Sequence, residues 1–239
     1  MNKSPERDVK TDQSLVFNDY YNQYNKLMEE NLRFLTPKGN IGYFAERKMA
    51  ILRKLMTTTP EKILEYGCGI GNNLSFLKKQ FPGVPIWGCD TSEKSLEVAE
   101  QKHPDIHFFL ISQANNSNMK FDCILVSDVV HHIPASQREF YLEKILDYLT
   151  PSGKIVFFEH NPLNPLTRVL VSTCPFDENA ELISLRSMRD LLKNKGLFVV
   201  KSRYCFYFPE FLQYFDRFEH MISWLPFGGK YYVLAAKNP

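Results

Sequence analysis

The sequence predicts one α/β domain, a doubly wound, mostly parallel sheet of seven strands with helices ahead of it in the chain. Two observations carry this prediction. Short apolar runs alternate with segments of helical spacing, and a glycine-rich turn directly follows the first run. With 239 residues and 44% hydrophobic content, the chain is long enough to bury one full core.

The region before the first strand is predicted to be helical. Residues 1–14 are polar and are expected to form a flexible end, so the predicted domain covers residues 15–239. Aromatic and aliphatic side chains then recur at helical spacing over residues 15–56. The sequence TPKGN divides this stretch into two helices.

Five apolar runs are predicted to be the first five strands: residues 62–66, 84–89, 106–111, 122–127 and 154–159. Their apolar residues are consecutive, as in strands that are covered on both faces. A helix over residues 136–149 is expected to begin with a capping box of Ser136 and Glu139, and TPSG at residues 150–153 is expected to form a turn. A further helix begins near Ser187, ends at Gly196, and is followed by strands at residues 197–208 and 230–236.

Composition argues against several classes of protein. The formal charge is only +2, with 29 basic and 27 acidic residues interspersed, so a nucleic-acid partner is not indicated. The five cysteines include no C-x-x-C pair, so we expect neither a disulfide framework nor a metal site. No apolar run approaches the ~20 residues of a membrane span, and the N-terminus lacks the apolar core of a signal peptide. A soluble cytoplasmic protein is expected.

The stretch ILEYGCGIGNN, residues 63–73, is typical of a turn that brings backbone close to a ligand. Its glycines are spaced by two, whereas the dinucleotide fingerprint needs a third glycine where this chain has Asn72. Glu65 stands two residues before the first glycine, and Asp90 closes the second strand. A carboxylate at that place can accept both hydroxyls of a ribose. A tight turn without a ligand is the alternative.

These features resemble motifs I and II of class I S-adenosylmethionine-dependent methyltransferases. FDCILVSDVVHHIP and LTPSGKIVFFEHNP resemble the fourth- and fifth-strand segments of that family, and the four segments occur in the family's order. The resemblance extends from about Tyr43 to the C-terminus. It implies a Rossmann-like methyltransferase fold, S-adenosylmethionine as cofactor and S-adenosylhomocysteine as product.

The resemblance also implies roles for matching positions. The glycine loop would lie against the methionine and ribose of the cofactor, Glu65 would act through the loop on the methionine amino group, Asp90 would hold the ribose, and Thr91 would lie beside the adenine. Where many members have an acid after the third strand, this chain has Ser112 and Gln113, and the Gln113 amide oxygen could accept the same hydrogen bond. The implied cofactor-binding residues are Glu65, Gly67, Cys68, Gly69, Gly71, Asp90, Thr91, Ser112, Gln113 and Ser127.

Candidates for catalysis follow the fourth and fifth strands, whose carboxyl ends face the ligand crevice of such sheets. These positions hold His131, His132, Glu159 and His160. His160 and His132 are the candidate catalytic residues, because an imidazole with a pKa near neutrality can accept a hydroxyl proton. Packing near the cofactor is the alternative for His132, an ordering hydrogen bond is the alternative for His160, and Glu159 is interpreted as structural.

Two later segments are expected to form or flank the acceptor pocket. Residues 160–185 contain two Asn-Pro pairs and offer Arg168 and Asp177 as polar contacts, with a packed connection as the alternative. Residues 209–227 carry aromatic side chains at helical spacing and are predicted to form a helix packed on the sheet. A surface for a lipid-linked acceptor or a dimer contact is the alternative reading of that segment.

The function that these patterns favour is methyl transfer from S-adenosylmethionine to a small molecule, with O-methylation of a sugar or glycan precursor as the first hypothesis. C-methylation of a quinone-like or secondary-metabolite ring and a non-catalytic cofactor-binding module are the alternatives. RNA is a weaker candidate, because no basic, aromatic-rich stretch is evident. The acceptor and the oligomeric state stay open.

Overall fold

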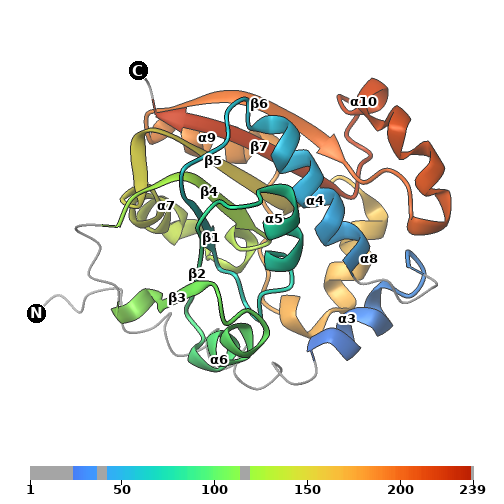
Figure 1. Ribbon diagram of the computed structural model, residues 1–239. Coiled ribbons are helices and arrows are strands. Elements are labelled where there is room, and N and C mark those ends of the chain that lie inside the picture. The colour runs from blue at the N-terminus through green and yellow to red at the C-terminus, as the bar shows by residue number, and fades with distance from the viewer. Residues whose placement is uncertain (1–23, 37–41, 114–118, 238–239) are drawn as a thin grey trace, which may run out of the picture.

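The computed structural model describes residues 24–36, 42–113 and 119–237 (Figure 1). One sheet of seven strands runs through the molecule in the order β3-β2-β1-β4-β5-β7-β6. Strands β1 to β5 pair in parallel, and β7 runs antiparallel to both of its neighbours. The predicted fold class is therefore confirmed. The strands are β1 (Ile63–Tyr66), β2 (Ile86–Asp90), β3 (His107–Leu110), β4 (Phe121–Ser127), β5 (Leu149–His160), β6 (Leu197–Cys205) and β7 (Lys230–Lys237).

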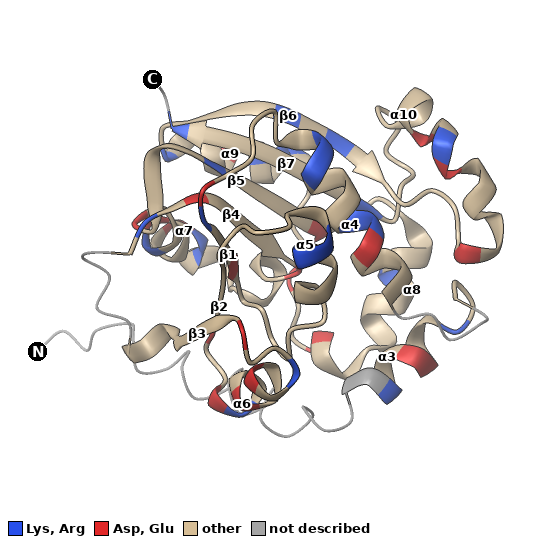
Figure 2. Ribbon diagram, viewed as in Figure 1, with Lys and Arg blue, Asp and Glu red and all other residues tan. Residues whose placement is uncertain are grey.

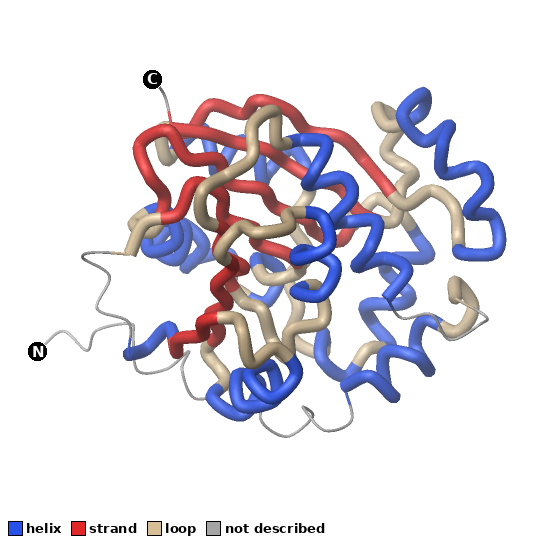
Figure 3. The backbone as a smooth tube through the Cα atoms, viewed as in Figure 1, coloured by secondary structure: helices blue, strands red, loops and turns tan. Residues whose placement is uncertain are grey.

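Helices cover both faces of this sheet, as Figure 3 shows in its blue and red layers. The α-helices are α3 (Tyr24–Leu32), α4 (Gly42–Leu55), α5 (Leu74–Gln80), α6 (Glu93–Lys102), α7 (Arg138–Leu146), α8 (Pro165–Thr173), α9 (Leu185–Asn194) and α10 (Glu219–Ile222). The 3₁₀ turns are η1 (Ile111–Gln113), η2 (Val130–His132), η3 (Ala135–Gln137), η4 (Pro175–Asp177) and η5 (Glu210–Phe218). The predicted start of the first helix at residue 15 lies outside the described residues.

Two apolar layers hold the sheet. On one face, α4 and α5 pack Met49, Leu52 and Leu74 against alternate strand residues such as Leu125 and Val156. On the other face, α7 and α9 pack against the intervening residues of the same strands, which include Val126 and Phe157. Because β1, β4 and β5 are buried on both faces, their apolar residues are consecutive in the sequence, as predicted.

Two local predictions are wrong. The helix predicted over residues 136–149 is shorter: α7 begins at Arg138, its N-cap is Gln137, and no side chain caps it, so Ser136 and Glu139 form no capping box. Leu149 instead begins β5, which includes the predicted TPSG turn. Phe121 and Cys123 of β4 pair with Leu149 and Lys154 of β5, so the register of the two strands shifts between these pairs. The extra residues of β5 are accommodated within the strand as an irregularity.

The aromatic segment does not pack on the sheet as predicted. It forms η5 and α10 at the margin of the molecule, beside the end of β6, where the Tyr204 amide donates a hydrogen bond to Ser223 O (Figures 1 and 3). Several of its large apolar side chains are exposed, Trp224 at 69% and Tyr214 at 66% among them. Figure 2 places acidic and basic residues together on helices such as α6, in agreement with the interspersed charge of the sequence.

Candidate active site

A cavity of about 1100 Å³ opens over the carboxyl ends of β1, β2, β4 and β5. The strand order changes direction between β1 and β4, and such a switch point is where open α/β sheets bind ligands. The far wall comes from α3, α4, α8 and the start of η5. A typical ligand pocket measures roughly 300–1,000 Å³. This cavity therefore has room for a cofactor and a second ligand.

The glycine loop after β1 forms one end of the cavity. Gly67, Gly69 and Gly71 all have left-handed φ angles, of 74°, 53° and 79°. A Cβ atom on Gly67 would lie 2.5 Å from Val129 Cγ2, and one on Gly71 would lie 2.9 Å from the His103 ring. A Cβ atom on Gly69 would meet nothing within 4 Å. Gly69 thus leaves open space where a ligand can approach the backbone.

The two acids of this region are held by neighbouring polar groups. Asp90 Oδ2 accepts a hydrogen bond from the Gly69 amide at 2.8 Å, and its Oδ1 accepts one from the Ser92 amide at 2.9 Å. Glu65 Oε1 accepts from Asn73 Nδ2 at 2.6 Å, while Glu65 Oε2 is buried and has no hydrogen-bond partner. Burial raises the pKa of Glu65 to about 7, and the Asn73 hydrogen bond opposes that shift.

The structure brings most of the predicted cofactor residues to the cavity. Those that line it are Gly67, Cys68, Gly69, Asp90, Thr91, Ser112 and Ser127. Glu65 and Gly71 lie behind the loop, where they contact Asn73 and His103. Gln113 is exposed and does not line the cavity, because the chain turns as η1 after β3 and presents Ile111 and Ser112 instead.

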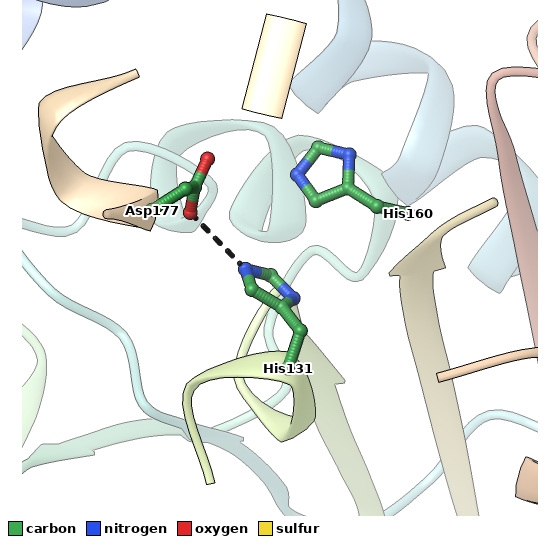
Figure 4. Close-up of side chains that lie close together, drawn as sticks. All are labelled: His131, His160 and Asp177. Carbon is green, nitrogen blue, oxygen red and sulfur yellow. Dashed lines mark hydrogen bonds and ion pairs between the residues drawn. The ribbon is translucent and has the colours of Figure 1, made fainter. Parts of the chain in front are cut away.

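Over the carboxyl ends of β4 and β5, a buried imidazole lies between two carboxylates. His131 Nδ1 is 2.5 Å from Glu159 Oε2, and His131 Nε2 is 3.3 Å from Asp177 Oδ1 (Figure 4). Burial would lower the pKa of His131, but the two carboxylates raise it to about 10, so the ring is an imidazolium. Glu159 also accepts hydrogen bonds from the backbone amides of Val129 and Val130. Its predicted structural role fits these contacts.

A second ion-pair network lies beside the first. Asp128 follows β4 directly with a left-handed φ of 61° and pairs with Lys48 at 3.0 Å and with Lys230. The Lys230 ammonium also lies 3.2 and 3.3 Å from the two ring nitrogens of His160. Although burial would raise the pKa of Asp128, Lys230 and Lys48 hold it well below its ordinary value. Two ammonium groups therefore face one carboxylate.

The pKa expected near neutrality for His160 and His132 is not found. Both rings line the cavity, as predicted. Burial and then Lys230 lower the pKa of His160 well below its ordinary value, and burial and then His131 lower that of His132 to about 3. Both imidazoles are therefore neutral and weakly basic at pH 7, and they suit hydrogen bonding better than proton abstraction.

Ligand atoms of His131, His160 and Asp177 lie within 4.8 Å of one another, a spacing compatible with a metal ion (Figure 4). The charges around them argue for an ion-pair network instead. The imidazolium of His131 already stands between the carboxylates, and the Lys230 ammonium contacts both nitrogens of His160. A divalent cation here would have to displace the positive charge of His131 and would lie beside the ammonium group of Lys230.

Sequence reasoning missed Lys48, Asp128 and Lys230. Asp128 carried a usable signal, because it stands directly after an apolar run. Lys48 is one of several basic residues on α4, and Lys230 is the first residue of an antiparallel strand, so neither position points to a site. Of the two polar contacts expected from residues 160–185, Asp177 lines the cavity, whereas Arg168 is exposed and does not.

Comparison with known proteins decides the family. Residues 25–202 match the family described as "Methyltransferase domain". The chain belongs to this methyltransferase family. Its cofactor is S-adenosylmethionine, and the site fits that group, since Gly69 leaves open space over the loop and the buried Glu65 Oε2 lacks a partner.

Curated relatives of this methyltransferase include two with named acceptors. A trans-aconitate 2-methyltransferase of Rhodopseudomonas palustris is 22% identical over 62% of this chain and 58% of its own length. A demethylmenaquinone methyltransferase of Thermotoga maritima is 28% identical over 52% of this chain and 55% of its own length. The chain thus spans somewhat more than half the length of these relatives.

A solved structure shares the fold of this methyltransferase. Magnesium protoporphyrin IX methyltransferase from Synechocystis, with S-adenosylmethionine bound, superimposes with a TM-score of 0.60 at 15% identity, covering 100% of both chains. At that identity the likeness concerns the fold alone. In the described part of this chain, no helix combines the length and apolar character needed to cross a membrane.

Proposed function

We propose that the chain transfers the methyl group of S-adenosylmethionine to an acidic hydroxyl of a small molecule with an apolar, ring-sized body. One observation carries the proposal: the Lys48–Asp128–Lys230 network and His160 line the same largely apolar cavity as the glycine loop. The cofactor supplies an electrophilic methyl group, so the chain mainly has to align the acceptor with it.

The position of Lys230 favours an oxyanion as nucleophile. The two ion-pair networks balance each other, with Lys48, Lys230 and His131 against Asp128, Glu159 and Asp177. The Lys230 ammonium nevertheless lies directly beside His160, where it stabilises a negatively charged acceptor oxygen. The imidazoles of His132 and His160 are too weakly basic to ionise an ordinary alcohol readily. A hydroxyl that ionises near neutral pH, such as a phenol, needs no strong base. A neutral His160 would then orient that oxygen by a hydrogen bond.

The cavity walls favour an apolar body for the acceptor. The acceptor side presents aliphatic and aromatic side chains from α3, α8, η4 and the residues before η5, among them Leu35, Leu170, Phe176 and Phe208. A sugar needs many polar partners. The polar side chains of these walls include Asn164, Thr167 and Tyr207, and each of the three already donates a hydrogen bond to a backbone carbonyl. The lining therefore favours the ring-type acceptor over the sugar precursor of the first hypothesis. The curated relatives named for trans-aconitate and demethylmenaquinone show that similar chains act on small molecules other than sugars.

The cofactor would be held by the glycine loop and Asp90. Gly69 lets the backbone lie against the ligand, and Asp90, fixed by two amides, keeps lone pairs free for the ribose hydroxyls. Thr91 and Ser112 line the cavity and would lie beside the adenine. Glu65 would act through Asn73 on the methionine end.

The test is incubation with methyl-labelled S-adenosylmethionine and a cell extract separated into apolar and aqueous small-molecule fractions. Label in an apolar product that bears a methyl ether is the expected result. Label in a carbohydrate, or on a ring carbon, would replace the proposal with the corresponding alternative. If the chain binds the cofactor but no fraction becomes labelled, the chain would be a cofactor-binding module that does not catalyse methyl transfer.

His160→Ala tests the role of that ring once a product is known. It should bind S-adenosylmethionine normally and transfer methyl at least tenfold more slowly, because the acceptor oxygen loses its orientation. His107→Ala is the matched control, since His107 is exposed at the start of β3 and does not line the cavity. Unchanged turnover of the His160 variant would remove His160 from the mechanism.

A further inference from the structure

The segment of η5 and α10 has its charged and apolar sides reversed relative to an ordinary surface helix. Its acids turn inward: Arg47 of α4 pairs with Glu219 at 2.6 Å and with Asp216 at 3.3 Å, and Tyr43 donates a hydrogen bond to Asp216. Its aromatic residues turn outward. We define the aromatic face as Phe211, Tyr214, Phe218, Met221, Trp224 and Phe227, which are between 42% and 69% exposed.

The aromatic face is large for a water-exposed surface. Aromatic side chains bury roughly 150–250 Å² each, so the five aromatic members expose on the order of 600 Å². The largest apolar patch of a typical monomer covers about 300–600 Å² and is often functional. The ion pairs of Arg47 with Asp216 and Glu219 fix this orientation, because turning the segment over would break both of them.

The aromatic face is continuous with the mouth of the cavity. Phe211 lines the cavity together with the exposed Phe34 and Leu166. Two hydrogen bonds keep these elements adjacent: the Glu210 amide donates to Leu35 O at 2.8 Å, and Asn164 Nδ2 donates to Phe227 O at 2.6 Å. Phe211 therefore belongs both to the aromatic face and to the cavity lining, so the two apolar surfaces meet at this side chain.

The charge on this face suits phospholipid headgroups. Within residues 210–227, the exposed ionisable side chains are Arg217 and His220, while the three acids are buried or half-buried. Arg217 lies 3.8 Å from the centroid of the Tyr214 ring, so a cation is held within the aromatic surface. Tyrosine, tryptophan and arginine are the residues that anchor proteins at a membrane–water interface.

We propose that the aromatic face docks on an anionic lipid surface and that the acceptor reaches the cavity from that surface. This inference rests on the proposed function, because it assumes an apolar acceptor. A second copy of the chain is the competing occupant. Lipid is favoured because the face borders the cavity mouth, through which the acceptor has to pass.

Vesicle flotation of the tag-free full chain tests the proposal. Wild-type protein should float with phosphatidylcholine vesicles that contain phosphatidylglycerol and float less with phosphatidylcholine alone. Phe218→Ser, Met221→Ser and Trp224→Ser combined should reduce the bound fraction at least tenfold. The matched control is Phe198→Ser with Val200→Ser on β6, which removes equally exposed apolar side chains away from the aromatic face and should float like wild type.

Two further measurements keep the outcome interpretable. The chain has two tryptophans, so Trp87→Phe leaves Trp224 as sole reporter, and its emission should shift to shorter wavelength with vesicles. S-adenosylmethionine affinity in lipid-free buffer should be equal in all variants, which separates this inference from the proposed function. Absence of flotation, or equal loss in the control, would overturn lipid docking. Lipid docking would also be overturned if the wild type did not float and formed a dimer in sedimentation equilibrium that the triple variant abolished.

Discussion

Asp90 and Asp128 occupy equivalent positions, each at the carboxyl end of a parallel strand, yet different groups bind the two carboxylates. Backbone amides of Gly69 and Ser92 hold Asp90, whereas the side chains of Lys48 and Lys230 hold Asp128. Amide donors leave a carboxylate available for ligand hydroxyls. Ammonium groups create a charged environment that acts on whatever binds beside it.

The sequence separations between each carboxylate and its hydrogen-bond donors differ as well. The donors to Asp90 lie 21 and 2 residues away, while Lys48 and Lys230 lie 80 and 102 residues from Asp128. The cofactor end is therefore built by neighbouring loops, and the acceptor end by packing of remote elements. Mutations should consequently affect ligand affinity at the cofactor end and stability at the acceptor end.

The largest effect is expected for Glu159→Gln. Removing Glu159 breaks a buried pair and leaves the His131 charge facing Asp177 alone, so the free energy of unfolding should fall by about 3–5 kcal/mol. Urea denaturation measures this loss. The control is Glu143→Gln, whose side chain is 60% exposed and 2.9 Å from Lys195. The control should change stability by less than about 0.5 kcal/mol. Equal losses would mean that the buried network contributes no more than a surface pair.

Gly69→Val should abolish most cofactor binding. The valine side chain would fill the open space above the loop, and we expect affinity to fall at least a hundredfold, which is about 2.7 kcal/mol. Gly83→Val is the control, because Gly83 also has a positive φ and open space but lies outside the cavity. Both variants should lose similar stability from backbone strain. Calorimetry that finds retained binding in a folded Gly69 variant would contradict the assignment of the loop.

Asp90→Ala should weaken S-adenosylmethionine binding about tenfold, which corresponds to ~1.4 kcal/mol. The ribose loses its acceptor, and the Gly69 amide loses its partner. Asp122→Ala, at the amino end of β4 and outside the cavity lining, should bind normally. If the two variants bind equally well in titration calorimetry, Asp90 does not contact the cofactor.

The smallest expected effect is a proton released on cofactor binding. The Glu65 pKa is raised from 4.5 to about 7, so its contribution to stability is present below pH 4.5 and is lost as the pH rises through 7. A cofactor ammonium nearby would lower that pKa, and binding at pH 7 should release up to about half a proton. Calorimetry in buffers of different ionisation enthalpy measures this release. Glu65→Gln should release less, and an equal release would assign the proton to another group.

The structure departs from sequence-based expectation mainly at the acceptor end. His132 and His160 reach the cavity as predicted, but a pKa near neutrality was the wrong inference for both. Their pKa values depend on burial and on Lys230 and His131, and none of these influences can be read from local spacing. The aromatic segment illustrates the same point, because helical spacing identifies an apolar side without saying which way it turns.

The sequence by itself determined the strand order along the chain, the family, the glycine loop and the acid at Asp90. Consecutive apolar residues and left-handed glycines act within a few residues of one another, so their consequences are local. Only the tertiary structure decided that Lys48 and Lys230 meet at Asp128, that His131 is charged, and that Arg47 turns the aromatic residues of η5 outward. Those features arise because ion pairs form between whichever charged groups packing brings together. Their energies depend on burial, which no short stretch of sequence specifies.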